Sequence, residues 1–462
     1  MTVPSLPEKI APTHSLNNRN KMPPEPEFAA DTAEGHGSLL VLAALALVVG
    51  AVSGLVGAVF RLSLAQADAF RDAAIAWAHG GGFAGFLLVT AACGGTAAIA
   101  AWLVRRYERR ALGSGIPDVE AVLHGELKPA PLRLIPVKFV GGLLAIGGGL
   151  ALGREGPSVQ MAAIIGRFVG LAFRRSWPDC RVLLAAGAGA GLATAFNAPI
   201  AGAVFVLEEL VRKFELRIAI AALGASATAI SVALVLLGGA PDFHVPDLAR
   251  PRIEAMPLYF VLGAAAGLAA VAYNRTLLAA LAVADRFENW PVEVRAATVG
   301  AAVGILAWFM PGLVGGGDAI SQRTLAGGEV LAFLPLAFLI RFGLGAVSYA
   351  AGTPGGLFAP MLALGAQFGL MFGIICQSAF AGLDIEPAAF AVVGMAAFFT
   401  GVVRAPLTGI VLVTEMTASV ATLLPMLGAG FMAMTVPTLL RDAPIYDSLR
   451  ERTAQRARAG KV

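Results

Sequence analysis

The chain has 462 residues, of which 57% are hydrophobic and 14% charged, and its formal net charge is +4. This composition is too apolar for a soluble enzyme of several domains, and the small positive charge fits loop bias in a membrane protein rather than nucleic-acid binding. Apolar runs of spanning or nearly spanning length recur from Ser38 onward, without the short alternation of polar and apolar residues that marks a membrane barrel. The sequence therefore predicts an all-α integral membrane protein in a lipid bilayer.

The ends of the chain differ from its middle. Residues 1–37 hold many prolines among charged and small residues, a composition that cannot bury enough apolar surface to fold alone. We predict a disordered cytoplasmic N-terminal tail over 1–37, a transmembrane domain over 38–440, and a short basic cytoplasmic C-terminus over 441–462.

The first two spans are expected at Leu39 to Phe60 and at Ala84 to Val104, separated by a short polar connection that carries Asp68 and Arg71. A basic cluster at 105–110 follows the second span directly, and the positive-inside rule places it in the cytoplasm. With two spans between them, the N-terminus lies on the same side, and the basic C-terminal residues place that end there too. We expect a multi-pass protein of the cell (inner) membrane with both termini cytoplasmic.

Beyond residue 110 the apolar segments are short and are broken by glycine and proline. The breaks lie at 113–117, 153–157, 197–199, 353–360 and 403–406. Kinked helices in a tight bundle could explain any one of them. Interrupted segments in corresponding halves are typical of transporters, where the ends of half-helices face a buried ion. Five breaks favour this second interpretation.

An internal repeat supports it. Ala198-Pro199, Gly202 and Glu208 recur as Ala405-Pro406, Gly409 and Glu415, with a uniform offset of 207 residues. The pattern predicts two related halves, at about 38–240 and 256–440. It does not say whether the halves are inverted relative to each other.

The break at 153–157 reads Gly153-Arg154-Glu155-Gly156-Pro157. Adjacent ionisable side chains at membrane depth are costly and are typical of functional sites. The glycines let the backbone approach a ligand, and Pro157 fits the first turn of a helix. A helix that starts here would direct its unpaired N–H groups and positive dipole end at an anion. Glu155 would be a tethered anion in the place where a free one would bind.

Other segments carry neutral hydrogen-bond donors. Ser114 stands in GSGIP (113–117), glycines expose backbone N–H groups beside Leu357 and Phe358 in GGLFAP (355–360), and Tyr446 follows the last apolar segment. Neutral donors suit a weakly basic halide because they bind it without trapping it. Each has a simpler alternative on its own: a helix N-cap for the serine, a loop for GGLFAP, and an interfacial aromatic residue for the tyrosine.

Several acids and bases remain. Glu208 and Glu209 end an apolar run and precede two basic residues, so they form either a surface ion-pair cluster or, for one of them, a cytoplasmic proton port. Because isolated buried charges need partners, four further residues are expected to be structural and to pair among themselves. These are Asp118, Glu120, Lys138 and Arg154.

Taken in order, GSGIP, GREGP, GGLFAP and Tyr446 identify a resemblance to the CLC family of chloride channels and chloride/proton exchangers, over about residues 38 to 450. The resemblance implies an inverted-repeat bundle of tilted, partly re-entrant helices. It also implies a homodimer with one pathway per subunit, and no enzyme activity or cofactor, with chloride as the bound substrate ion. Too few residues follow Tyr446 for the C-terminal regulatory domains that many eukaryotic members carry, so a prokaryotic-type member is expected.

The resemblance also implies roles for single residues. A central anion would be held by the hydroxyls of Ser114 and Tyr446 and the backbone N–H groups of Leu357 and Phe358. An outer anion site would use backbone N–H groups from Arg154 to Gly156. Glu155 corresponds to the family's gating glutamate, and Glu209, in AFNAPIAGAVFVLEE, to the inner proton-transfer glutamate of the exchangers.

These roles describe a competition between a proton and an anion. An ionised Glu155 can occupy the outer anion site, and a protonated one leaves it. The carboxylate at Glu209 favours a secondary active transporter that exchanges chloride for protons. A passive CLC-type chloride channel is the alternative. An intramembrane hydrolase based on Ser114 is a weaker alternative, because all five histidines lie outside the clear apolar runs and cannot supply a base at depth.

Overall fold

The computed structural model describes residues 36–245 and 248–458. The chain separates into two units, Met1–Leu40 and Val41–Val462. In the first unit only residues 36–40 are described, and they are helical. The predicted disorder of the N-terminal tail therefore concerns residues that lie almost entirely outside the described part.

The described part of the chain is built from α-helices, and its β-structure is limited to two isolated bridges. The α-helices are α1 His36–His79, α2 Gly82–Tyr107, α3 Ile116–Leu123, α4 Leu134–Gly147, α5 Glu155–Ala172, α6 Trp177–Phe196, α7 Pro199–Phe205, α8 Leu216–Leu237, α9 Met256–Arg286, α10 Val292–Phe309, α11 Asp318–Leu325, α12 Leu334–Ala350, α13 Phe358–Ala379, α14 Pro387–Val403, α15 Pro406–Thr417, α16 Leu423–Leu439 and α17 Ile445–Arg458. Short 3-10 or π turns are η1 Arg109–Ala111, η2 Val206–Leu210, η3 Ile253–Ala255, η4 Pro311–Leu313 and η5 Ala381–Leu383.

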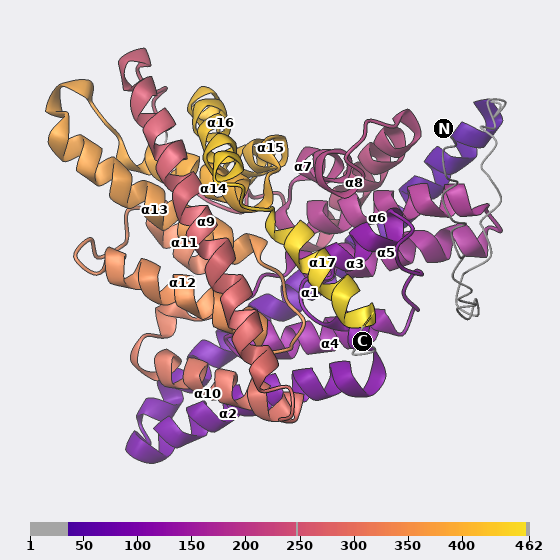
Figure 1. Cartoon of the computed structure of the whole chain (residues 1–462), viewed down its shortest axis with the longest axis horizontal. Coiled ribbons are helices and arrows are strands. Elements are labelled where there is room, and N and C mark those ends of the chain that lie inside the picture. The colour runs from indigo at the N-terminus through magenta and orange to yellow at the C-terminus, as the bar shows by residue number, and fades with distance from the viewer. Residues whose placement is uncertain (1–35, 246–247, 459–462) are drawn as a thin grey trace, which may run out of the picture. The chain divides into compact units, whose positions relative to one another are not determined.

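Seven of the described helices are long and apolar enough to cross a membrane: α1, α2, α6, α8, α9, α10 and α13. The two predicted N-terminal spans are confirmed as parts of α1 and α2, and α2 packs along α10 (Figure 1). The predicted polar connection after Phe60 is wrong, because α1 continues to His79. Its charges are compatible with a helix since Arg71 pairs with Asp68 at 2.5 Å and with Asp72 at 2.9 Å.

Two helices, α6 and α14, form the interior of the second unit. Every residue from 182 to 196 of α6 and from 389 to 403 of α14 is buried. These stretches lie 207 residues apart, in the register of the sequence repeat. Each packs against the helix that precedes it, α6 on α5 and α14 on α13. A helix that is apolar on all sides belongs in the centre of a bundle, where neighbouring helices cover it.

The repeat also pairs two helices directly. The Ala-Pro breaks start α7 and α15, which pack against each other. Glu208, in the π turn η2 that follows α7, accepts hydrogen bonds of 3.0 and 2.6 Å from two backbone N–H groups in the first turn of α15. Glu415, at the end of α15, accepts bonds of 3.0 and 2.8 Å from the first turn of α7. Equivalent residues therefore cap each other's helices reciprocally, as a two-fold relation between the segments requires.

Candidate functional site

Three of the Gly/Pro breaks meet through backbone hydrogen bonds, with GGLFAP between the other two. On one side, the Gly113 N–H donates to the Thr353 carbonyl (3.1 Å) and the Gly355 N–H donates to the Gly113 carbonyl (3.0 Å). On the other side, Gly153 and Gly356 exchange N–H···O bonds of 2.9 and 2.7 Å. The starts of α3, α5 and α13 are thereby held at one place. Because helix N-termini carry unpaired N–H groups and partial positive charge, this place favours an anion.

Ser114 lies between two glycines in the left-handed backbone region, Gly113 (φ +62°) and Gly115 (φ +86°). The residue that caps α3 is Gly115, and no side-chain cap bond is made, so the alternative of Ser114 as an ordinary N-cap is wrong. Its hydroxyl oxygen is buried and has no hydrogen-bond partner among the described residues. The loop therefore presents a hydroxyl that no described residue binds with hydrogen-bond geometry.

The carbonyl side of this loop is held by a buried cation. Lys138, on α4, is fully buried, and its Nζ donates to the carbonyls of Gly113 (2.7 Å) and Ala111 (3.0 Å). Lys138 thereby fixes the carbonyl side of the loop, while the Gly113 N–H is held by the Thr353 carbonyl. The lysine Nζ is thereby held on the carbonyl of the residue that precedes Ser114.

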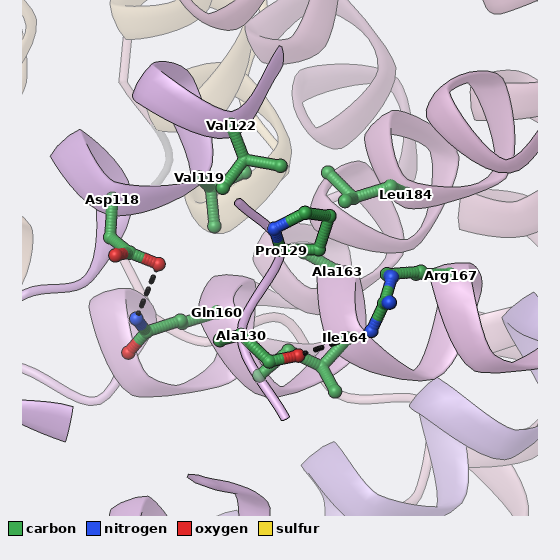
Figure 2. Close-up of a pocket in the computed structure, with 10 residues that line it drawn as sticks. All are labelled: Asp118, Val119, Val122, Pro129, Ala130, Gln160, Ala163, Ile164, Arg167 and Leu184. Carbon is green, nitrogen blue, oxygen red and sulfur yellow. Dashed lines mark hydrogen bonds between the residues drawn. The ribbon is translucent and has the colours of Figure 1, made fainter. Parts of the chain in front are cut away.

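A second support comes from α5. The Gln160 side-chain amide donates to the Asp118 carboxylate at 3.1 Å, as Figure 2 shows, and to the Arg110 carbonyl at 3.1 Å. These bonds tie α5 to both ends of the GSGIP loop. The Gln160 side chain also packs beneath Gly115, since a Cβ on that glycine would lie 2.3 Å from the amide oxygen. Two side chains therefore fix the loop: Gln160 of α5 and Lys138 of α4.

Glu155 is the first residue of α5, which confirms the predicted helix start. The side chain is fully buried, and one carboxylate oxygen accepts a 2.6 Å hydrogen bond from the Phe358 N–H at the start of α13. The other oxygen has no partner among the described residues. The carboxylate of one motif therefore sits on a helix N-terminus that belongs to another, and it is bound by a neutral donor instead of a cation.

Gly156 brings GREGP against GSGIP. A Cβ at this position would lie 2.5 Å from the Ser114 hydroxyl oxygen and 2.6 Å from the Ser114 carbonyl oxygen. Real Cβ atoms do not approach other atoms this closely. Only glycine therefore permits the spacing between the first turn of α5 and Ser114.

Tyr446 reaches the same place from the C-terminal helix. It lies in the first turn of α17, is fully buried, and its ring centroid is 5.9 Å from that of Phe358. The interpretation as an interfacial aromatic residue is therefore wrong. Its hydroxyl lies close enough to Ser114 to interact, yet neither hydroxyl has a partner with hydrogen-bond geometry in the described structure. Further aromatic rings surround Phe358, namely Phe196, Phe205 and Phe399, and keep the surroundings dry.

The predicted pairing among four charged residues is wrong. Asp118 pairs with Arg110 (2.7 Å), Glu120 with Arg450 (2.8 Å), Arg154 with Asp318 (2.8 Å) and Asp242 (3.2 Å), and Lys138 with backbone carbonyls. None of the four pairs with another of the four: Asp118 finds its partner just before its own helix, whereas Glu120 and Arg154 find theirs on distant segments. In Arg154, the side chain and the backbone therefore have separate surroundings. Two carboxylates hold the guanidinium, while the backbone lies next to Glu155.

Glu208 and Glu209 are neighbours in sequence but have different surroundings. Glu208 caps α15, so it is not part of an ion-pair cluster in the described structure. Glu209 lies in the π turn η2, is only 3% exposed, and is 3.5 Å from the Arg212 guanidinium. That arginine also contacts Glu120 (3.4 Å) and Asp447 (2.8 Å). Glu209 is therefore a nearly buried acid within a network of charges.

Two separate cavities reach these groups. One of about 490 Å³ borders Ser114 and is called the vestibule below; its basic residues are Arg109, Arg110, Lys128, Arg295 and Arg452. The other, of about 580 Å³, borders Glu208, Glu209 and Arg212. The two sets of lining residues do not overlap. Ser114 and Glu209 are thus reached through different cavities.

The sequence did not single out Gln160 or Tyr349. The Gln160 side chain fixes the GSGIP loop, and Tyr349 lies at the end of α12 with its hydroxyl 3.4 Å from the Ser114 N–H. Glutamine in an apolar helical run could have been noticed as a buried polar group in need of partners. No local signal marks Tyr349, because its neighbour is 235 positions away in the chain.

Comparison with known proteins gives one consistent result. The family model described as voltage gated chloride channel matches residues 96–438. The H(+)/Cl(-) exchange transporter ClcA of Vibrio cholerae is 37% identical over 415 residues, covering 88% of this chain and 89% of the relative. The ClcA of Salmonella arizonae is 35% identical over 421 residues, covering 90% and 89%. A slow cyanobacterial Cl-/H+ antiporter of known crystal structure superposes with a TM-score of 0.87 and 32% identity, covering 91% of this chain and 99% of that one. The chain therefore belongs to the CLC, or voltage gated chloride channel, family of membrane transport proteins.

Proposed function

We propose that the chain is a secondary active transporter that exchanges chloride for protons across the cell (inner) membrane. The observation that carries the proposal is the buried Glu155 carboxylate on the Phe358 N–H at 2.6 Å, beside the unpartnered hydroxyls of Ser114 and Tyr446. A tethered anion occupies a place made of neutral donors, and a halide can compete for the same place. Relatives named H(+)/Cl(-) exchange transporters support this reading.

The coupling follows from the charge of the carboxyl group. Burial of an ionised carboxylate away from water is costly unless hydrogen bonds offset it, and the Phe358 N–H supplies one. Protonation removes the charge and with it the stronger charge-assisted bond. The neutral side chain then leaves the N–H groups, and chloride takes them. One proton is thereby bound for each displacement of Glu155 by an anion.

The anion is held by neutral donors in this proposal. The central position uses the Ser114 and Tyr446 hydroxyls and the backbone N–H groups of Leu357 and Phe358. The outer position uses the backbone N–H groups from Arg154 to Gly156. The salt bridges of Arg154 to Asp318 and Asp242 support this assignment, because a guanidinium held by two carboxylates does not trap the anion.

Exchange also needs a proton route to the other side, and Glu209 is the proposed inner acceptor. Its support is threefold: it is nearly buried, it adjoins the cavity of about 580 Å³, and that cavity shares no lining residue with the vestibule. The proposal includes a homodimer with one pathway per subunit and cytoplasmic termini. Static light scattering in detergent tests the dimer, and thiol accessibility of terminal cysteines in oriented vesicles tests the topology.

The central experiment follows chloride and proton flux together in proteoliposomes that carry a chloride gradient. The variants are Glu155→Gln and Glu209→Gln, which remove a charge at nearly constant volume. Glu254→Gln is the control, since Glu254 is an exposed residue of η3. We expect Glu155→Gln to move chloride without protons, Glu209→Gln to lose proton movement while chloride still moves, and the control to match wild type.

Two outcomes would contradict parts of this proposal. Wild-type protein that moves chloride but never drives protons uphill would be a passive channel. Normal proton pumping by both variants would mean that these two acids have been assigned wrongly. Either result can be interpreted because chloride flux in the same vesicles shows that the protein is folded and inserted.

A further inference from the structure

Tyr349 places a third hydroxyl on the anion route, at the boundary between the vestibule and Ser114. It lies in the last turn of α12 and lines the vestibule. Its oxygen accepts a hydrogen bond from the Ser114 backbone N–H at an N···O distance of 3.4 Å. This is the one hydrogen bond recorded for the hydroxyl in the described structure. The backbone N–H of Ser114, a residue that lines the vestibule, is therefore already occupied.

The geometry gives the hydroxyl little freedom to lie elsewhere. The aromatic ring rests on Gly113, where an added Cβ would be 3.1 Å from the hydroxyl oxygen. Gly113 itself is fixed by the Lys138 ammonium on its carbonyl (2.7 Å) and by the Thr353 carbonyl on its N–H (3.1 Å). Ring and loop thus hold the hydroxyl against the Ser114 N–H. Removal of the oxygen alone would leave the ring packing intact.

The bond that it makes is weak. At 3.4 Å it lies beyond the usual 2.7–3.2 Å range for N–H···O bonds, and both partners are neutral. An N–H group binds an anion more strongly than it binds a neutral hydroxyl, because the bond to the anion is charge-assisted. The bond to Tyr349 therefore yields when an anion reaches the loop, and it re-forms when the anion leaves. Five basic residues and two acids, Asp118 and Asp285, line the vestibule, so its lining carries a net positive charge even though Arg452 pairs with Asp285 and Arg110 with Asp118. A net positive lining raises the local anion concentration.

We propose that the Tyr349 hydroxyl is a positioning group of the inner mouth, which occupies the Ser114 N–H in the empty state and competes there with the entering anion. This inference rests on the proposed function, in which Ser114 lies on the chloride route. The competition lowers chloride affinity on the vestibule side and keeps the loop N–H satisfied between transport events. Tyr349 is thus a determinant of anion affinity that acts through Ser114.

Calorimetric titration of the detergent-solubilised full chain with chloride tests the inference. Tyr349→Phe removes the competing oxygen, and Tyr259→Phe is the matched control, a buried tyrosine stacked on Phe390 at 4.2 Å. We expect Tyr349→Phe to bind chloride roughly two- to tenfold more tightly, the range that corresponds to loss of one competing neutral hydrogen bond. Tyr259→Phe should bind as wild type does. In proteoliposomes, half-saturation of Tyr349→Phe should shift to lower chloride while the number of protons moved per chloride stays unchanged.

Unchanged or weaker chloride binding by Tyr349→Phe would overturn the inference. Thermal unfolding of the same samples reports any loss of folding, which the conservative change should not cause. A different set of results, obtained with wild-type protein, would contradict the proposed function. Wild-type protein that binds chloride but does not exchange it for protons contradicts the exchanger, yet leaves the comparison of binding affinities valid. Wild-type protein that does not bind chloride contradicts both.

Discussion

The substitution Gly156→Ala tests directly how closely the first turn of α5 approaches Ser114. The added Cβ would lie 2.5 Å from the Ser114 hydroxyl oxygen and 2.6 Å from its carbonyl oxygen. The hydroxyl can rotate away, but the carbonyl is fixed in the loop, so the first turn of α5 must separate from GSGIP. Overpacking of this kind costs about 1–3 kcal/mol. The separation also moves the N–H groups near Glu155 away from Ser114, and we expect chloride affinity to fall on the order of tenfold, or about 1.4 kcal/mol.

Gly95→Ala is the matched control. Gly95 lies inside α2, where a Cβ would meet nothing within 4 Å. Alanine in a helix interior is more stable than glycine by about 0.5–1 kcal/mol, so this variant should unfold at the same or a higher temperature. Calorimetric chloride titration and thermal unfolding in detergent measure both effects. If Gly156→Ala behaves like Gly95→Ala in the two assays, the close approach of α5 to Ser114 has been described wrongly.

The remaining predictions concern the caps and the buried cation. Glu208→Gln and Glu415→Gln should each lower stability by about 1–2 kcal/mol, because each loses a charged cap on the opposite helix; equal falls in unfolding temperature would support the reciprocal arrangement, and no fall in either would contradict it. Lys138→Met removes the Nζ donor from the carbonyls of Gly113 and Ala111, and the Gly113 carbonyl keeps only the bond from the Gly355 N–H. Chloride binding should weaken at least severalfold, and unaltered binding with unaltered unfolding temperature would refute that role for the lysine.

Local chemistry explains which elements could be predicted. The breaks at 113–117, 153–157 and 353–360 start α3, α5 and α13, and the two Ala-Pro breaks start α7 and α15. Glycine and proline act on the backbone within a few residues, so their effect does not depend on the rest of the fold. The family, too, followed from four short motifs in order. The roles of Glu155 and Glu209 stay predictions until fluxes are measured.

The errors concern charged side chains. The charges after Phe60 were interpreted as a connection, but α1 accommodates them as pairs between Arg71 and its close neighbours in the same helix. Arg154 was expected to pair within its own group of four, whereas its partners Asp318 and Asp242 come from distant segments. An ion pair depends on which segments lie next to each other in the fold, and a local sequence pattern does not show contacts between residues 88 or 164 positions apart.

The sequence by itself determined that the chain is a helical membrane protein, where its broken helices begin, and which family it belongs to, since hydrophobicity, backbone preference and short motifs are local properties. Only the tertiary structure decided that GGLFAP lies between GSGIP and GREGP, that Glu155 reaches the Phe358 N–H, and that the hydroxyls of Ser114 and Tyr446 have no hydrogen-bond partner among the residues it describes. The physical reason is that a site made of backbone N–H groups and hydroxyls acquires its affinity from the convergence of distant chain segments, which is set by packing.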